Sequence, residues 1–467
     1  MAGWTTPYHL LREEFTQRRD EGCQVPAELA ERFAALDAER DAWRTDRIDP
    51  LYDAVMALPE DAALAACEPN ELAAIRALRP GGPRDLHWQP SEAEALDRFH
   101  GAWTGRCVGC ALGKPVEGMG MGVREGRLVG RADIKRYLSE RGDWPLRDYI
   151  SARELPGDGP RVWATGSVRE RIDCMEPDDD IHYSLVGLGV LEATGPDFTW
   201  QDVAAFWTSH IPFAMICTAE TQAILNLWNR SCHGWPRGKG AATSEWTRRW
   251  RNPYREWIGA QIRSDGWAWA CAGKPELAAE FAWRDASWTH ERNGIYGAMF
   301  CAAMQAAAFV ESDPCRLIAI GLSEIPAQCR LARQVRAALG WVDACPDFEA
   351  CMERLEAALP TMSAVHTINN ALVCVLALCY GAMDPTRSVT TAVMCGLDTD
   401  CNGATVGSLV GAVSGRARFG DGLAARLNDT IKPGIVGFAE VRMAELARRT
   451  LVQWRRVEAW RGANVAV

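Results

Sequence analysis

Apolar residues recur at helical rather than alternating spacing over most of the chain, which predicts helices and few strands. Strand-like alternation is scarce, and no tandem repeat is present. Beyond about residue 96, the spacing predicts helices over residues 181–194, 203–228, 275–284, 293–311, 328–339, 366–383 and 403–414. The pattern therefore predicts an all-α fold, built as a compact bundle of many helices.

Residues 1–95 differ from the rest of the chain. They are rich in helix-forming residues with interspersed charges, and they are interrupted by Pro50, Pro59, Pro69 and the segment RPGGPRD at 79–85. We predict a helical N-terminal extension over residues 1–95 and one main domain over residues 96–467. The extension contains no pattern that indicates a chemical role.

Two sets of glycines recur every four residues within helical stretches. Glycine inside a helix costs up to about 1 kcal/mol relative to alanine, so periodic glycine suggests a helix face that another backbone approaches closely. The sets are Gly101, Gly105, Gly109 and Gly113, and Gly403, Gly407, Gly411 and Gly415. Paired membrane helices show similar spacing, but these segments are short and flanked by polar residues. We predict two central helices packed tightly near a site.

Charge and hydropathy argue against a nucleic-acid-binding protein and against a membrane protein. The chain is 48% hydrophobic, and 51 Lys and Arg against 61 Asp and Glu give a net charge of −10. Such a chain lacks the basic surface of a dedicated nucleic-acid-binding protein. The longest uncharged apolar run, 371–383, is too short to span a bilayer, and no apolar export signal is visible. We expect a soluble, cytoplasmic protein without membrane association; its oligomeric state is not indicated.

The 17 cysteines are scattered singly. Their odd number favours reduced thiols, most of them buried, over a disulfide framework. The one CxxC pair, Cys107 and Cys110, has no second pair and lies within the first glycine set. We therefore do not expect it to bind zinc or act in redox chemistry.

Three consecutive aspartates, Asp178 to Asp180, precede a predicted helix. A carboxylate at a helix N-terminus is stabilised by exposed N–H groups, which accounts for one of them. Adjacent like charges raise one another's pKa unless a cation neutralises them. Magnesium and manganese are hard cations that take such oxygen ligands.

A second acidic stretch reads CGLDTDCNG at 395–403, with Asp398 and Asp400 between apolar and small residues. It matches the first half of an EF-hand loop, but the twelfth position, Leu409, lacks the required glutamate. A turn with an N-cap explains one aspartate and leaves the other unexplained. Two acidic stretches distant in sequence can converge on one or two metal ions.

A third stretch, GCALGKPVEG at 109–118, places Glu117 among flexible glycines. This composition suits a mobile loop over a site. A plain loop at the C-terminal end of a helix is the alternative when the stretch is considered by itself.

Together the three stretches resemble motifs of the ADP-ribosylglycohydrolase family. The family pattern is L-G-x-P-x-E, then T-D-D-T, then G-G-D-T-D-T-N, and the corresponding residues occur here in that order. They are Leu112 to Glu117, Asp178 to Ile181, and Gly396 to Asn402. The resemblance covers roughly residues 96–450.

This resemblance implies an all-helical fold with two Mg²⁺ or Mn²⁺ ions. The implied metal ligands are Asp178, Asp179, Asp180, Asp398, Asp400 and Cys401. Glu117 matches a loop glutamate close to the metals, flanked by Gly113 and Gly118 as substrate-binding positions. Arg263 matches a loop that binds phosphate and ribose, and His290 matches a histidine near the distal ribose. For His290, a purely structural role remains an alternative.

Several residues depart from the family pattern. Asp178 and Ile181 replace threonines, Cys110 replaces an aspartate, and Cys401 replaces a threonine that binds metal. A thiol is a soft ligand that suits magnesium badly. The departures therefore leave the identity of the metal open.

Tryptophan is abundant, at 20 residues. Aromatic faces stack on flat ligand rings, and five tryptophans precede His290. They are Trp246, Trp250, Trp257, Trp267 and Trp269. Because most tryptophans pack in cores, we expect one or two of them at the site.

We predict a metal-dependent hydrolase that cleaves an N-glycosidic bond to ribose, with removal of ADP-ribose from a modified acceptor as its main reaction. The catalytic residues are predicted to be Glu117 and Asp179, one of which activates water or handles the leaving-group proton. One alternative is the same chemistry on a small N-ribosyl metabolite derived from NAD or a nucleoside. An alternative of another class is a non-catalytic binding or structural relative.

Overall fold

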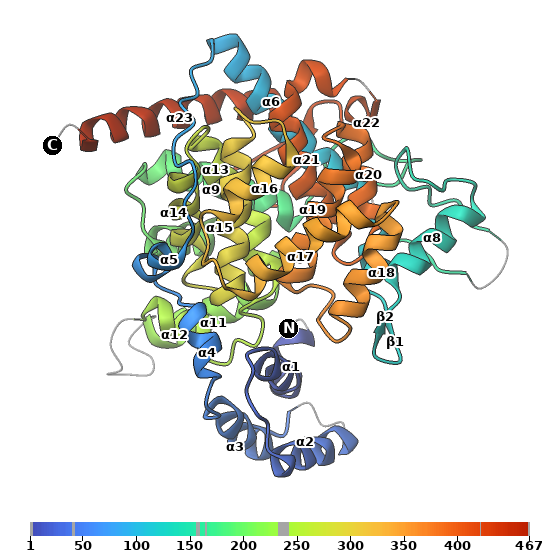
Figure 1. The fold of residues 1–467 in the computed structure, drawn as a ribbon, viewed down its shortest axis with the longest axis vertical. Helices are drawn as coiled ribbons and strands as arrows, with labels where there is room; N and C mark the ends of the chain where they lie inside the picture. Colours follow the sequence, from blue (N-terminus) through green and yellow to red (C-terminus); the bar gives the residue numbers. More distant parts are fainter. Residues whose placement is uncertain are drawn as a thin grey trace.

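The protein is predominantly helical in a computed structural model that describes residues 3–39, 43–155, 159–163, 166–231, 242–420 and 422–465 (Figure 1). The predicted all-α fold is confirmed. Within these residues the strands form two short antiparallel hairpins, β1 (Val123–Arg124) with β2 (Arg127–Leu128) and β3 (Thr430–Ile431) with β4 (Val441–Arg442).

The first five helices lie within residues 1–95. They are α1 (Pro7–Asp20), α2 (Ala27–Glu39), α3 (Thr45–Met56), α4 (Ala62–Cys67) and α5 (Leu72–Leu78). Helices α1 to α3 gather at one end of the molecule, away from the last helix, α23 (Met443–Val465) (Figure 1).

The other helices form the body of the protein. They are α6 (Glu92–Gly113), α7 (Glu117–Gly120), α8 (Gly130–Glu140), α9 (Asp179–Thr194), α10 (Trp200–His210), α11 (Thr218–Ser231), α12 (Ser244–Arg249), α13 (Asp265–Ala270), α14 (Pro275–Ala286), α15 (Arg292–Ala307), α16 (Pro314–Leu322), α17 (Arg330–Ala344), α18 (Phe348–Ala358), α19 (Thr367–Gly381), α20 (Pro385–Met394), α21 (Thr399–Phe419) and α22 (Gly422–Ala425). Short 3₁₀ turns include η2 (Lys114–Val116) and η5 (Ile258–Arg263).

Local sequence explains where several helices begin. Thr6, Asp313 and Asp384 each accept a hydrogen bond from a backbone N–H of the first turn, and each is followed by proline. Proline is favoured at the first helical position because its fixed φ suits the helix and its missing N–H is not needed there. Six of the seven predicted helices match observed ones within a few residues.

The prediction of a single helix over 203–228 is wrong. Helix α10 ends at His210 and α11 begins at Thr218, with Pro212 between them. Proline disfavours helical geometry in the residue before it, and Ile211 has extended angles, φ −97° and ψ 119°. The apolar spacing in the sequence continues across residues 211–217, although the proline ends the helix there.

Helices α6 and α21 form the central pair, and their two glycine sets face each other in antiparallel order. A Cβ added at Gly109 would lie 1.8 Å from the carbonyl oxygen of Gly403, and one at Gly105 would lie 2.0 Å from that of Gly407. The predicted close approach of two glycine-lined helices is confirmed. Only glycine allows the two backbones to come this near.

The antiparallel pairing joins one end of each helix. Gly113, the last residue of α6, accepts a hydrogen bond of 2.8 Å from the Thr399 hydroxyl of α21. The turn that carries Glu117 therefore lies against the turn that carries Asp398 and Asp400.

A large apolar core surrounds this pair, and a second apolar cluster forms where α1 and α3 meet the body. The second cluster contains Leu11, Phe15 and Tyr52 of the N-terminal part together with Ala219 and Tyr254 of the body. Trp257 packs against it. In the part of the chain that the structure describes, no helix is both long and apolar enough to cross a membrane, and the described cysteines are free thiols.

We expect Gly109→Ala to destabilise the protein by about 1–3 kcal/mol or more, because the added methyl group collides with a backbone that cannot rotate away. Thermal unfolding of the metal-free protein measures the change. The matched control is Gly340→Ala in α17, where an added Cβ meets nothing within 4 Å. That control should stabilise the protein by about 1 kcal/mol through helix propensity; equal effects at both positions would contradict the close approach.

Candidate metal centre

Three carboxylates meet where α6 ends and α21 begins. Oxygen atoms of Glu117, Asp398 and Asp400 all lie within 4.8 Å of one another. Glu117 opens α7 directly after the turn η2, Asp398 precedes α21, and Asp400 is in its first turn. The backbone N–H of Leu397 donates to the carbonyl of Gly120 at 3.0 Å, which ties the two turns together.

The turn before Asp398 depends on left-handed backbone angles. Gly396 has φ +75° and Leu397 has φ +59°. A leucine with left-handed backbone angles is strained, so contacts with the surrounding structure have to offset that cost. The side chain of Asn370 in α19 supports the turn: its oxygen accepts from the Asp398 N–H at 3.2 Å and from the Asn402 amide at 2.8 Å.

The segment before α9 joins this group from the other side. Asp180, Asp400 and Cys401 form a second set of atoms within 4.8 Å, and Cys110, Asp178 and Asp180 form a third. The Cys401 thiol donates to Asp180 at 3.2 Å. Since Asp180 and Asp400 each belong to two sets, the structure brings the three acidic stretches into one continuous cluster.

Two cations lie beside this cluster. Arg106 of α6 donates to Asp180 at 2.8 Å, and its guanidinium also lies 3.0 Å from Asp265. The ammonium of Lys114 lies 3.1 Å from Asp178. Asp178 also caps α9 by accepting from the Asp180 N–H at 3.0 Å, so capping accounts for one of the three aspartates.

The charges of the cluster do not balance. Its six carboxylates are Glu117, Asp178, Asp179, Asp180, Asp398 and Asp400, and among the described residues only Arg106 and Lys114 pair with them. With all six ionised, four negative charges are left after these two pairings, which equals the charge of two divalent ions. One oxygen of Asp398 is buried and makes no hydrogen bond with the described residues.

The carboxyl pKa values reflect this crowding. Burial, followed by the charges of Asp400 and Asp398, raises the pKa of Glu117 to about 12. Burial, Asp178 and Asp400 raise the pKa of Asp179 to about 8. Burial and Asp178 raise the pKa of Asp400 to about 6. Without a cation, the ionised cluster therefore opposes folding.

The donor atoms fit divalent cations in two different ways. Glu117, Asp398 and Asp400 offer oxygen alone, as Mg²⁺ and Mn²⁺ require. The set with Cys401 adds a thiol, which favours softer ions such as Zn²⁺ over Mg²⁺. The acidic cluster can therefore bind metal, and its ligands do not all prefer the same ion.

A cavity of about 860 Å³ opens onto the cluster, a volume typical of pockets for drug-sized and nucleotide-sized ligands. The residues of the cluster that line it are Glu117, Asp178, Asp179, Asp398, Asp400 and Cys401. Asp180 lies behind them, fully buried with Arg106. Of the five tryptophans from which one or two were expected at the site, Trp257 lines the cavity, whereas Trp267 and Trp269 are buried in the core.

The predicted substrate-binding residues occupy different positions. Arg263 and His290 are buried behind the residues that line the cavity. The Arg263 guanidinium donates to Asp285 at 2.6 Å and to the Thr289 hydroxyl at 2.6 Å. Arg263 also pairs with Glu220, which does line the cavity. Gly113 packs on Thr399, and a Cβ at Gly118 would lie 3.0 Å from the ring of Trp163. The roles of these four residues stay predictions.

Sequence reasoning missed Arg106, Lys114 and Asn370. A charged residue inside a glycine-lined helix was a usable signal for Arg106, because a buried arginine needs a carboxylate partner. Lys114 lies in the KPVE turn next to Glu117, where its charge was visible but its partner was not. No local pattern pointed to Asn370.

The comparison with family models identifies one family. A family model described as ADP-ribosylglycohydrolase matches residues 91–457. A solved structure described as an ADP-ribosylglycohydrolase-related protein complex has a TM-score of 0.48 and 20% sequence identity, and the match covers 78% of this chain and 99% of that one. No curated protein matches the chain.

We expect Asp400→Asn to stabilise the metal-free protein, raising its unfolding temperature by roughly 2 °C or more, because it removes one crowded charge. A carboxyl whose folded-state pKa is raised favours folding while protonated, and this contribution is lost as pH rises through that pKa. For Asp400 that value is about 6 against an ordinary 3.8, so the gap between variant and wild type should widen as pH rises from about 4 to about 6 and stay constant above that. Differential scanning calorimetry with a chelator measures it.

With Mn²⁺ in excess the order should reverse, because the variant loses a ligand and with it the stabilisation that bound metal provides. An unfolding temperature that rises equally with Mn²⁺ in both proteins would contradict a role for Asp400 in metal binding.

We expect Cys401→Ser to raise the affinity for Mg²⁺ relative to Zn²⁺ by about tenfold, since it exchanges a soft ligand for a hard one. Titration calorimetry with each metal measures the ratio. Cys315→Ser, at an exposed thiol, is the control. An unchanged ratio would place Cys401 outside the metal site.

Proposed function

Because the chain belongs to the ADP-ribosylglycohydrolase family, we propose that it hydrolyses an N-glycosidic bond to ribose and that its main reaction releases ADP-ribose from a modified acceptor. One observation carries this proposal. Carboxylates from three segments distant in sequence surround one part of a cavity large enough for a nucleotide.

The cofactors of this proposal are two divalent ions, Mg²⁺ or Mn²⁺. Glu117, Asp398 and Asp400 would hold one, and Asp180, Asp400 and Cys401 the other, so that Asp400 is shared. When bound, such ions supply a Lewis-acid clamp for the vicinal hydroxyl groups of a ribose.

The side chains around the cavity suit cleavage at an anomeric carbon. Positive charge develops on the sugar as its bond to the leaving group stretches. Asp179 and Glu117 both line the cavity and supply negative charge beside it. Either carboxylate can take a proton from the attacking water or return one to the leaving group.

The turn that carries Glu117 is positioned for this role by its neighbours. Lys114, three residues earlier, donates to the carbonyl of Pro177 at 2.5 Å and lies beside Asp178. The ammonium thus links the Glu117 turn to the start of α9. We propose Lys114 as a positioning residue for Glu117 and Asp179.

A diphosphate has a candidate binding surface on the same cavity. Cys217 and Thr218 line it at the start of α11, a helix of 14 residues. Backbone N–H groups at a helix N-terminus bind phosphate oxygens, and the helix dipole favours their charge. This supports an ADP-ribosyl group as the bound portion of the substrate.

A second candidate substrate is a small N-ribosyl molecule without a diphosphate. Of the described residues that line the cavity, Lys114 is the one lysine or arginine, and its charge is already shared with Asp178. A diphosphate therefore gains no free cationic side chain there, whereas a riboside without phosphate groups needs none. This observation supports small NAD-derived or nucleoside-type ribosides as the second class of substrate.

We expect Glu117→Gln to lower kcat for release of ADP-ribose by about 10²–10⁴-fold, and Asp398→Asn to abolish stimulation by Mn²⁺. The assay follows release from an ADP-ribosylated protein, with parallel reactions on nicotinamide riboside, which lacks a diphosphate, and on NAD, which carries one. Glu353→Gln, exposed on α18, is the matched control and should retain wild-type turnover.

Undiminished turnover in Asp398→Asn would refute the proposed reaction. Cleavage of the small ribosides alone, still dependent on Asp398, would favour the second candidate substrate.

A further inference from the structure

The N-terminal part of the chain reaches the cavity. Trp4, Glu13 and Thr16 line it together with the carboxylates of the metal cluster. All three precede residue 91, where the match to the family model begins. Part of the cavity wall is therefore built by sequence that the family match does not cover.

Helix α1 directs different faces toward the cavity and the body. Glu13 and Thr16 are three residues apart and share one face, which lines the cavity. Glu14, Arg18 and Glu21, at spacings of four and three, share a neighbouring face that is buried. One face of the helix thus anchors it while the next contributes to the cavity.

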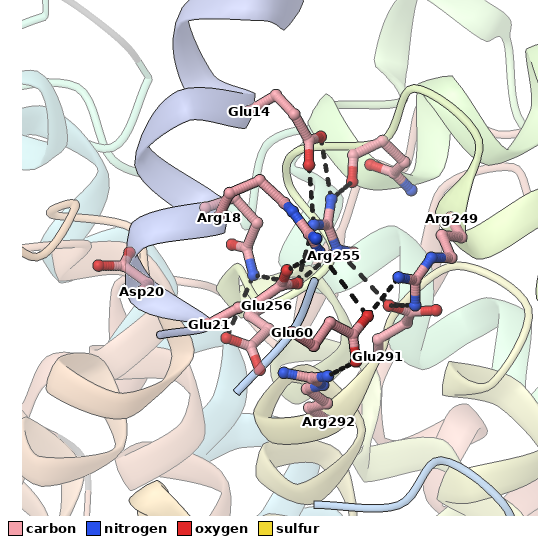
Figure 2. A network of polar contacts seen from close by, with 12 residues as sticks. Glu14, Arg18, Asp20, Glu21, Glu60, Arg249, Arg255, Glu256, Glu291 and Arg292 are labelled. Atoms are coloured by element: carbon pink, nitrogen blue, oxygen red, sulfur yellow. Dashed lines mark hydrogen bonds and ion pairs between the residues drawn. The ribbon is translucent and has the colours of Figure 1, made fainter. Parts of the chain in front are cut away.

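The anchor is a buried network of charges centred on Arg255 (Figure 2). The Arg255 guanidinium donates to both oxygens of Glu14, at 3.0 and 2.9 Å, and to Glu21 at 2.8 Å. Arg18 pairs with Glu21 at 2.7 Å. Removing one partner of such a buried ion pair leaves the other charge buried and unpaired, which strongly destabilises a protein, so α1 is firmly held.

Further contacts extend the anchor to the segment that lines the cavity. Arg330 donates to the Asp20 carbonyl at 2.8 Å, and the Tyr254 hydroxyl donates to the Trp4 carbonyl at 2.5 Å. Arg255 lies two residues before Trp257, which also lines the cavity. These contacts fix the N-terminal residues of the cavity wall relative to the segment of the body that carries Trp257.

We propose that Trp4, Glu13 and Thr16 form a binding subsite for a flat heterocycle that carries N–H donors. This subsite rests on the proposed function and deepens it, since such a ring is part of every substrate considered there. Trp4 and Trp257 pack against the same apolar cluster and both line the cavity, so their indole rings offer faces on which a ring can stack.

Glu13 and Thr16 supply the polar part of the subsite. A carboxylate and a hydroxyl accept hydrogen bonds from N–H groups of a ring. Glu13 is already paired with Arg12 at 2.7 Å, so the subsite does not require a ligand with a positive charge of its own. An amino-bearing ring satisfies the carboxylate without breaking that pair.

The test measures binding of adenosine and of ribose 5-phosphate to the full-length, Mn²⁺-loaded protein by titration calorimetry. We expect Trp4→Ala to weaken adenosine binding about tenfold, as loss of a stacking surface does, and to leave ribose 5-phosphate binding unchanged. Glu13→Ala and Thr16→Val should weaken adenosine binding in the same selective way. Because Glu13 lies outside the apolar cluster, its variant keeps the test decisive if Trp4→Ala folds poorly.

Matched controls come from the same N-terminal part. Trp43→Ala and Glu31→Gln change exposed residues that do not line the cavity, and both should bind adenosine like the wild type. The subsite is refuted if wild type does not bind adenosine, or if all three subsite variants bind it unchanged.

Two comparisons identify the ring and separate this inference from the proposed reaction. If Trp4→Ala weakens ADP-ribose binding but not nicotinamide riboside binding, the subsite takes the base at the far end of the substrate; the reverse result assigns it to the group released. Selective adenosine binding without any Asp398-dependent hydrolysis supports the subsite and refutes the reaction. Asp398-dependent hydrolysis, together with adenosine binding that is unchanged in all three subsite variants, supports the reaction and refutes the subsite.

Discussion

The close approach of α6 and α21 is the constraint on which the rest of the structure depends. Glycine carbonyls of one helix lie where the Cβ atoms of the other would be, so the pair has little freedom in spacing or register. Because the helices are antiparallel, the end of α6 meets the start of α21. That meeting places Glu117 against Asp398 and Asp400, and the buried partner of Asp180, Arg106, extends from the same helix α6.

The molecule contains two buried clusters of charge that are balanced in different ways. Around Arg255, the carboxylates of Glu14 and Glu21 pair with Arg255 of the body and with Arg18 of the N-terminal part, so side chains neutralise one another. Around Asp400, carboxylates outnumber cations, and the raised pKa values of Glu117 and Asp179 express the cost of that imbalance. The first cluster supports the fold without a ligand, whereas the imbalance of the second is what the divalent ions of the proposed function would offset.

This division suits a binding site assembled from two parts of the chain. The unbalanced cluster lies in the region that matches the family model, and the balanced cluster fastens an additional wall to it. Under the proposed subsite, differences in that wall would alter which ring is accepted and leave the acidic cluster unchanged. The thiols of Cys110 and Cys401, which lie among the carboxylates, point to a similar adjustment in the choice of metal.

The sequence by itself determined the all-helical class, the pairing of the two glycine-lined helices and the three acidic stretches. Each of these depends on residue type and spacing within a short window, and such signals are readable in one dimension. The tertiary structure alone decided which charges pair: Lys114 with Asp178, Arg106 with Asp180, and Arg263 with Glu220 behind the wall. It also revealed that Trp4 and Glu13 reach the cavity. These contacts join residues far apart in the chain, and they depend on side-chain direction and on the path of the backbone between them, neither of which is encoded by local spacing.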